Sequence, residues 1–352
     1  MDTTLIRIIA IGASAGGVEA MLRLAPQLPA GFPAPILLVV HIGAHPSLMP
    51  ELLNARGPNR AVFARTGAVP AAGTIYVAPP DEHLLLENGT IRLSRGPKEH
   101  HTRPAIDPLF RSMALDAGPR AIGVVLTGLL DDGCAGMQAI KACGGTTVVQ
   151  DPADAAEPSM PRAALECVDV DHVVRLDGLA ALLSGLAEMP VKAAKPAAVA
   201  TVAATAIADA PDRLRVEHAI TLGNAHMREL ATIGTPSAFT CPDCGGALFE
   251  IHQSSPPRFL CHTGHAFSLR SLALTHEAIT DHALWSGLRA LQEKEAVLRR
   301  LAHARGHEAA SAAAALAEAD RLVGFIDHLR HAVVKGPPGR LVESAPAEPP
   351  AG

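Results

Sequence analysis

The chain has 352 residues, a length typical of two domains, and its net charge of −5 comes without a dense basic block, so nucleic acid is not an expected partner. Its 8 Phe, one Trp and one Tyr also argue against the aromatic stacking surfaces of single-stranded nucleic-acid binders. No apolar run reaches the ~18–20 residues that span a bilayer, and the first residues lack a signal-peptide pattern. We therefore expect a cytoplasmic protein without membrane insertion.

Between residues 4 and 180, short apolar segments alternate with segments of helical spacing. The apolar segments expected to be strands are Leu5–Ile11, Ile36–Val40, Thr74–Val77, Ala121–Leu126, Thr146–Val149 and His172–Leu176. Asn88-Gly89 predicts a hairpin turn between two further strands, 83–87 and 90–94. Helices are expected at 18–24, at 46–53, from Asp107 as N-cap, and at 133–143. This alternation predicts an α/β fold with a doubly wound, mostly parallel sheet.

The remainder of the chain differs in composition. Residues 190–213 are rich in Ala and Pro and are expected to link a catalytic domain, 1–189, to a smaller module, 214–335. That module combines a cysteine knuckle with leucines at helical spacing, which predicts an α-helical hairpin. The tail, 336–352, is rich in Pro, Gly and Glu and is expected to be disordered. Such a linker predicts that the two cores fold independently.

Three strands of the predicted sheet end in reactive side chains, and catalytic groups gather at the carboxyl ends of parallel strands. Ser14 lies in a G-x-S-x-G segment, the strand–turn–helix spacing of a nucleophile elbow. His41 follows the second strand, and Asp131 and Asp132 follow the strand 121–126. A serine, a histidine base and an orienting aspartate are the parts of a nucleophilic hydrolase. Either Asp131 or Asp132 fits the role of the orienting aspartate.

Each of these residues also has another interpretation. A glycine turn after a first strand is common in dinucleotide-binding loops, but that fingerprint needs a glycine in place of Ser14 and an acid in place of His41. A single histidine is most often a core residue, and Asp131 and Asp132 are suited to cap the following helix. The order Ser…His…Asp differs from that of the α/β-hydrolase fold. The combination at three strand ends favours an ester hydrolase over a dehydrogenase.

Spaced motifs over residues 4–185 resemble the methylesterase domain of the CheB family, the chemotaxis-receptor glutamate methylesterases. The matching segments are Ile11–Gly17, His41, Gly73–Pro80, Arg103–Ser112, Leu126–Gly133 and Gln150–Arg162. Carried over position by position, the resemblance implies that Ser14 is the nucleophile and that His41 is the base. Asp132 is the acid because it directly precedes a glycine. One turn departs from the family pattern, since Gly128-Leu129-Leu130 stands where the family has a Gly-Met-Gly-like turn.

The resemblance implies hydrolysis of glutamate γ-methyl esters of chemoreceptors or related signalling receptors, and also deamidation of receptor glutamines. It implies no cofactor for catalysis. The expected partners are methylated chemoreceptor-like proteins, with a sensor kinase or a methyltransferase as further candidates. Many members begin with a phosphorylatable receiver domain, which this chain is expected to lack because it starts at the first catalytic strand. The alternative function is a signalling adaptor that binds a receptor or kinase without turnover.

Four side chains further along have the spacing of metal ligands. Cys241-x₂-Cys244 precedes Cys261-x₃-His265, a set that matches a closed tetrahedral structural zinc site. His262 competes with His265 as the fourth ligand, but it directly follows Cys261. The alternative is four free polar residues near a turn. Receiver-less CheB-like proteins resemble this segment, and its expected role is partner docking or dimerisation.

The other conspicuous residues are expected to be structural or peripheral. The cysteines expected to be small buried residues of a reduced protein are Cys134, Cys143 and Cys167. The histidines expected at the surface or at the substrate rim are His45, His83, His100 and His101. Asp107 is expected only to cap a helix.

Overall fold

The computed structural model of the protein describes residues 6–41, 46–191, 210–224, 227–304 and 309–335. The chain forms two compact units, Met1–Leu272 and Ala273–Gly352, which are described separately. The expected linker, 190–213, lies mostly outside the described residues, and the expected tail, 336–352, lies entirely outside them.

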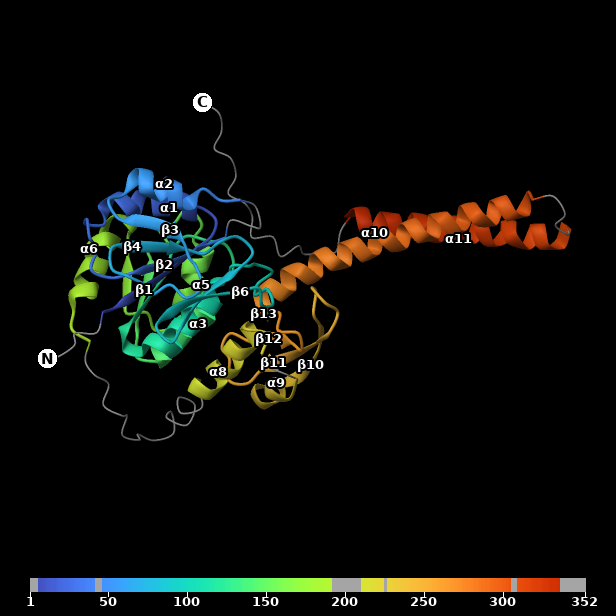
Figure 1. Ribbon diagram of the computed structural model, residues 1–352. Coiled ribbons are helices and arrows are strands. Elements are labelled where there is room, and N and C mark those ends of the chain that lie inside the picture. The colour runs from blue at the N-terminus through green and yellow to red at the C-terminus, as the bar shows by residue number, and fades with distance from the viewer. Residues whose placement is uncertain (1–5, 42–45, 192–209, 225–226, 305–308, 336–352) are drawn as a thin grey trace, which may run out of the picture. The chain divides into compact units, whose positions relative to one another are not determined.

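The first unit is built on a seven-stranded sheet with the order β3-β4-β2-β1-β7-β8-β9 (Figure 1). Its strands are β1 Ile8–Ala13, β2 Ile36–Val40, β3 Arg60–Phe63, β4 Thr74–Val77, β7 Ala121–Val125, β8 Thr146–Gln150 and β9 His172–Val174. All neighbouring strands run parallel. The central strands β1, β2 and β7 are buried along their whole length, as both faces of a parallel sheet require. The predicted α/β fold with a mostly parallel, doubly wound sheet is confirmed.

Helices cover both faces of this sheet (Figure 1). On one face, Ile9 and Ile11 of β1 belong to one hydrophobic cluster with residues of α1 Gly17–Leu24, α2 Met49–Arg56 and α6 Leu176–Glu188. On the other face, Ile8 and Ala10 contact a second cluster. The elements of that face are α3 Ile106–Ala117, α4 Cys134–Ala142, α5 Ser159–Cys167 and the hairpin of β5 His83–Glu87 with β6 Thr90–Ser94. Alternate residues of β1 thus enter two separate cores.

Some local elements differ from the predicted ones. The strand β3 is not predicted, because its four residues are only partly buried at the edge of the sheet. Helix α3 begins at Ile106 with Ala105 as N-cap, so Asp107 lies within the first turn and is not the N-cap. Two short 3₁₀ turns, η1 Ala25–Gln27 and η2 Gly118–Arg120, follow α1 and α3.

A second, antiparallel sheet lies in the same compact unit and is not predicted from the sequence. Its strands are β10 Gly234–Thr240, β11 Ala247–Ile251, β12 Arg258–Cys261 and β13 Ala266–Ser268, and it is preceded by α8 Ala210–Thr221 and α9 Met227–Ile233. Because residues 210–272 and the parallel sheet form one unit, the expected boundary of an independent module at residue 214 differs from the observed division at residue 272.

Two long helices follow, as the leucine spacing predicts. They are α10 Leu269–Ala302, most of which belongs to the second unit, and α11 Ala309–Lys335. They lie side by side (Figure 1) and are joined by ion pairs between Lys294 and Glu318 (2.7 Å) and between Arg299 and Asp320 (3.0 Å). Among the described residues, every helix is too short or too polar to cross a membrane.

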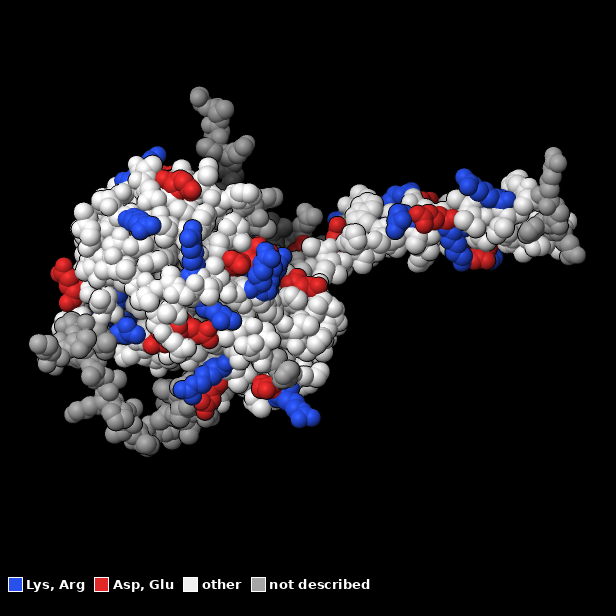
Figure 2. Space-filling view, in the orientation of Figure 1, with Lys and Arg blue, Asp and Glu red and all other residues white. Residues whose placement is uncertain are grey.

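The cysteines of the first unit are not all free thiols. Cys134 of α4 and Cys167 of α5 are joined by a disulfide, in contrast to the expectation of separate buried thiols. Cys143 is a free, partly buried thiol. On the face shown in Figure 2, acidic and basic side chains of the described residues are interspersed, in keeping with the balanced composition.

Candidate active site and metal centre

Ser14 lies in the tight turn between β1 and α1. Its backbone N–H donates to the carbonyl of Thr127 (3.0 Å), and its own carbonyl accepts from Gly17 N–H (2.8 Å). Gly16 has a φ of +76°, a left-handed conformation that glycine adopts without the steric cost of a Cβ. The turn therefore holds Ser14 at the carboxyl end of the parallel sheet, against the segment that follows β7.

His41 connects Ser14 to Asp132 through hydrogen bonds. It directly follows β2, its Nδ1 lies 3.1 Å from the Ser14 Oγ, and its Nε2 lies 2.9 Å from the Asp132 Oδ2. An ionised Asp132 accepts the Nε2–H proton, which leaves Nδ1 as the acceptor for the Ser14 hydroxyl. In trypsin-like proteases the two ring nitrogens have the opposite roles. The structure thus brings together three side chains that lie at separate strand ends in the sequence.

Asp132 is held at the N-terminus of α3. Its carboxylate accepts hydrogen bonds from the N–H groups of Ile106 (2.7 Å) and Asp107 (2.9 Å). Burial alone would raise the pKa of the Asp132 carboxyl. The His41 hydrogen bond, the positive charges of His100 and His41 and the Ile106 N–H outweigh burial and hold that pKa well below its usual range. Asp132 is therefore ionised at neutral pH, as the proposed tautomer requires.

His100 is buried next to Asp132, so the expected surface position is wrong. Its Nε2 lies 3.2 Å from Asp107 Oδ2 and 4.0 Å from Asp132 Oδ1, and its Nδ1 lies 3.9 Å from Asp131 Oδ1. Burial would lower the pKa of the imidazole, but the Asp107 hydrogen bond and the three negative charges raise it to about 9. A buried imidazolium thus offsets part of the acidic charge around Asp132.

Asp107 and Asp131 each have a partner other than His41. Asp107 Oδ1 accepts the N–H of Gly136 in α4 (2.6 Å), and Asp131 Oδ1 accepts the hydroxyl proton of Ser268 in β13 (2.8 Å). Of the two adjacent aspartates, Asp132 is therefore the one that orients His41. The sequence offers no signal for Ser268, because it lies 137 residues from its partner.

A cavity of about 110 Å³ lies beside His41. Its other lining residues are Asp81, Lys98, His101, Thr102, Arg103 and Pro104. Arg103 is held in place by Asp81 (2.8 Å) and by the Gly96 carbonyl (2.6 Å). A larger cavity, of about 410 Å³, lies between α2 and the strands β3 and β4 and contains no residue predicted to be catalytic.

The other histidines have different positions. His83 is buried, with its Nε2 2.9 Å from the Pro97 carbonyl and its Nδ1 accepting from the Ala105 N–H (3.2 Å), so the expected surface position is wrong for this residue as well. His101 lines the cavity at the rim of the site, as expected. His45 lies outside the described residues.

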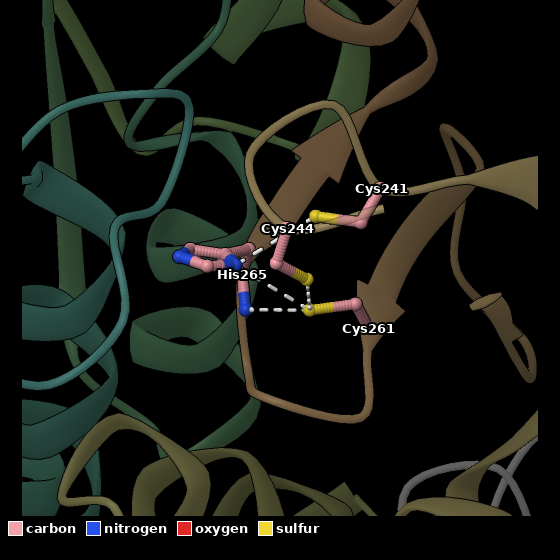
Figure 3. A group of neighbouring side chains, drawn as sticks. All are labelled: Cys241, Cys244, Cys261 and His265. Carbon is pink, nitrogen blue, oxygen red and sulfur yellow. Dashed lines mark hydrogen bonds between the residues drawn. The ribbon is translucent and has the colours of Figure 1, made fainter. Parts of the chain in front are cut away.

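The four candidate metal ligands converge, and Figure 3 shows their sulfur and nitrogen atoms pointing toward one another. Cys244 Sγ lies 3.7 Å from Cys261 Sγ, and His265 Nδ1 lies 3.7 Å from Cys241 Sγ and 3.5 Å from Cys261 Sγ. A tetrahedral zinc ion with Zn–S bonds of ~2.3 Å places neighbouring sulfurs about 3.8 Å apart. The donor set and its spacing therefore fit a closed Cys₃His zinc site.

The turns of the knuckle place His265, rather than His262, among the cysteines. His265 N–H donates to Cys261 Sγ (3.2 Å), and Cys241 N–H donates to the Gly246 carbonyl (2.7 Å). The His262 ring instead packs over Gly246, where a Cβ would come within 2.2 Å of it. A larger residue at this position would displace the exposed His262 ring.

Known proteins resemble the first half of this chain. A family model described as CheB methylesterase matches residues 9–183. A protein of Leptospira interrogans, provisionally named a protein-glutamate methylesterase/protein-glutamine glutaminase, is 40% identical over 180 residues, which make up 49% of this chain and 91% of that protein. Protein-glutamate methylesterase/protein-glutamine glutaminase 4 of Anaeromyxobacter dehalogenans is 37% identical over 189 residues, 50% of this chain and 51% of that relative.

A similar solved structure is the catalytic domain of the Thermotoga maritima CheB methylesterase, with 30% identity, a TM-score of 0.47, and coverage of 52% of this chain and 99% of that domain. The chain belongs to the CheB methylesterase family. The matched residues, 9–183, include Ser14, His41 and Asp132 and leave out the four candidate metal ligands.

Proposed function

We propose that this protein is a serine-type hydrolase that demethylates glutamate γ-methyl esters of chemoreceptors or related receptors. The observation that carries the proposal is the row of hydrogen bonds from Ser14 through His41 to a buried, ionised Asp132. A serine hydroxyl becomes a nucleophile when an oriented base accepts its proton. The names of the Leptospira and Anaeromyxobacter relatives support the same reaction.

The reaction follows from the positions of the three side chains. As Ser14 Oγ attacks the ester carbonyl, its proton passes to His41 Nδ1, and Asp132 stabilises the imidazolium through Nε2–H. His41 then gives the proton to the departing methoxide, so that methanol leaves and a glutamyl ester of Ser14 remains. His41 next takes a proton from water, and the hydroxide attacks this ester. As glutamate leaves, His41 returns the proton to Ser14 Oγ, which restores the hydroxyl. A glutamine side chain would lose ammonia by the same steps.

The oxyanion of the tetrahedral intermediate needs hydrogen-bond donors near Ser14. The N-terminus of α1 begins at Gly17, three residues after the serine, and backbone N–H groups at a helix start attract negative charge. Asp132 does not bind the oxyanion. It fixes the tautomer and the orientation of the His41 ring.

The cavity beside His41 is the proposed entry for the methylated side chain. Lys98 and Arg103 give part of its lining a positive charge, and Asp81 holds Arg103 in place. Positive charge near the site also suits the carboxylate that the reaction produces.

A zinc ion at Cys241, Cys244, Cys261 and His265 would be structural in this proposal. Four protein ligands close the coordination sphere, so the ion would join the two turns of the knuckle. The catalytic steps use Ser14, His41 and Asp132 alone and need no cofactor.

Release of methanol from a methylated receptor distinguishes this enzyme from a signalling adaptor with the same fold. We expect wild-type protein to release methanol and Ser14→Ala to lose at least about 10³-fold in rate. Ser184→Ala is the matched control, because the Ser184 hydroxyl donates within α6 to the Ala180 carbonyl. Receptor binding without methanol release by the wild-type protein would favour the adaptor.

A further inference from the structure

Residues 265–268 contact three functional regions in succession. These are the candidate metal site, the loop beside the substrate cavity, and the turn that holds Asp131 and Asp132. His265 is a candidate metal ligand. The carbonyl of the next residue, Ala266, accepts the backbone N–H of His100 (2.9 Å). Ser268 then donates its hydroxyl proton to Asp131 (2.8 Å), the neighbour of Asp132. These contacts join the second sheet to the surroundings of the proposed active site.

The loop that lines the cavity contacts β13 through an isolated backbone bridge. Glu99 forms a parallel bridge with Ala266, and Ala266 N–H donates to the Lys98 carbonyl (3.3 Å). His101, which lines the cavity, has its Nδ1 3.0 Å from Asp243 Oδ1 and its ring centroid 4.9 Å from that of Phe267. Asp243 lies between the candidate ligands Cys241 and Cys244, so the knuckle itself holds one wall of the cavity.

Buried charges fix the second sheet in place. Arg111 of α3 donates to Glu99 (2.9 Å), and its Nε lies 3.7 Å from Glu217 of α8. Glu217 also pairs with Arg258 of β12 (2.9 Å), and all four side chains are buried. Removing one partner of a buried ion pair leaves an uncompensated charge in the interior, which is strongly destabilising. These buried ion pairs therefore tie α8 and β12 to α3, beside the contacts that reach the proposed active site.

We propose that the metal knuckle and β13 are a working part of the esterase site, in which Asp243 and Ser268 are positioning residues. Asp243 fixes His101 in the wall of the substrate cavity. Ser268 fixes Asp131, and with it the turn that presents Asp132 to His41. The inference rests on the proposed function. It assigns a role in substrate binding and turnover to the metal knuckle and β13, which lie outside the matched residues 9–183.

The role of Asp243 is tested by measuring KM and kcat separately for methanol release from a methylated receptor. We expect Asp243→Ala to raise KM about 3- to 10-fold, the effect of losing one hydrogen bond, with kcat within two-fold of wild type. Asp243→Asn keeps an oxygen that accepts from the imidazole and restores KM. Glu166→Gln is the control, since it removes the charge of an exposed ion pair to Arg270, and neither residue lines the cavity. An unchanged KM in Asp243→Ala with intact metal content would overturn this role.

The Ser268 arm is tested with a fluorophosphonate, which reacts with an activated serine and needs no receptor. We expect Ser268→Ala to slow labelling of Ser14, and to lower kcat, by about 10-fold without a change in KM. Labelling at the wild-type rate in a folded Ser268→Ala protein would overturn this arm. If Ser268→Ala does not fold, the KM of Asp243→Ala decides whether the knuckle contributes to the esterase site. If the wild-type protein is labelled at Ser14 but releases no methanol, the proposed function is refuted. The labelling rates of wild type and Ser268→Ala would still test whether Ser268 positions the turn that holds Asp131 and Asp132.

Discussion

Gly128 lies so close to Ser14 that a Cβ added to it would stand 2.9 Å from the Cβ of the serine and 2.6 Å from the Met160 methyl group. The first residue of the unusual Gly128-Leu129-Leu130 turn is therefore a glycine for a steric reason. The turn between β1 and α1 and the turn after β7 pack directly on each other, and the position of Ser14 depends on both.

Replacing Gly128 by alanine should displace Ser14 relative to His41. A misplacement of about 1 Å at a reacting group can cost on the order of 10²-fold in rate, so we expect Gly128→Ala to lower kcat by about 10- to 100-fold. Gly185→Ala in α6 is the matched control, because a Cβ there meets nothing within 4 Å. The steric account is contradicted if steady-state assays find both variants equally active.

The third residue of that turn, Leu130, has a φ of +63°, where an L-residue is strained. The left-handed conformation costs a non-glycine residue roughly 1–2 kcal/mol. We therefore expect Leu130→Gly to keep a free energy of unfolding roughly 1 kcal/mol higher than Leu130→Ala, since alanine retains the backbone strain that glycine relieves. Urea denaturation of the two variants measures this difference. Equal losses would show that the Leu130 backbone is not strained.

The charge on His100 should make the stability of the protein depend on pH. Its folded pKa of about 9 lies above the unfolded value of about 6.5, so its contribution is complete below pH 6.5 and is lost as the pH rises through 9. This contribution corresponds to at most roughly 3 kcal/mol. We expect the difference in unfolding free energy between wild type and His100→Gln to shrink between pH 6.5 and 9.5. A difference that stays constant over this range would show that His100 is not a buried cation.

Metal binding should stabilise the whole first unit, because the second sheet shares buried charges with α3. We expect about one zinc ion per chain in metal analysis of the purified protein. Cys261→Ser should lose the metal and lower the unfolding temperature of the parallel-sheet domain as well. Cys143→Ser is the control, since this thiol lies outside the ligand cluster. Loss of metal with an unchanged main unfolding transition would instead support the independent cores that the linker predicts.

The parallel sheet and the row of Ser14, His41 and Asp132 can be anticipated from sequence because their signals are local. Buried parallel strands appear as short apolar runs, and each proposed catalytic residue directly follows such a run or the glycine turn after it. The choice of Asp132 over Asp131 rests on the resemblance, and the structure supplies the physical reason, namely two N–H groups of α3 that bind the Asp132 carboxylate.

The contacts that sequence reasoning misses are non-local. The strands of the second sheet have three to seven residues, too few to show a clear hydrophobic period. His100 lies in an irregular loop with a positive φ, and its burial depends on β13, more than 160 residues further along the chain. Ser268 and Asp243 carry no motif, so only the folded chain reveals that they contact the surroundings of the proposed active site.

During turnover, Ser14 should form a covalent glutamyl ester. Rapid acid quenching of the protein with a methylated receptor peptide, followed by peptide mapping by mass spectrometry, tests it most directly. We expect the peptide containing Ser14 to gain the mass of the receptor peptide minus methanol, and His41→Gln to abolish this adduct. Steady release of methanol by the wild-type protein, with no adduct on Ser14 at any quench time and the same rate in Ser14→Ala, would contradict the account.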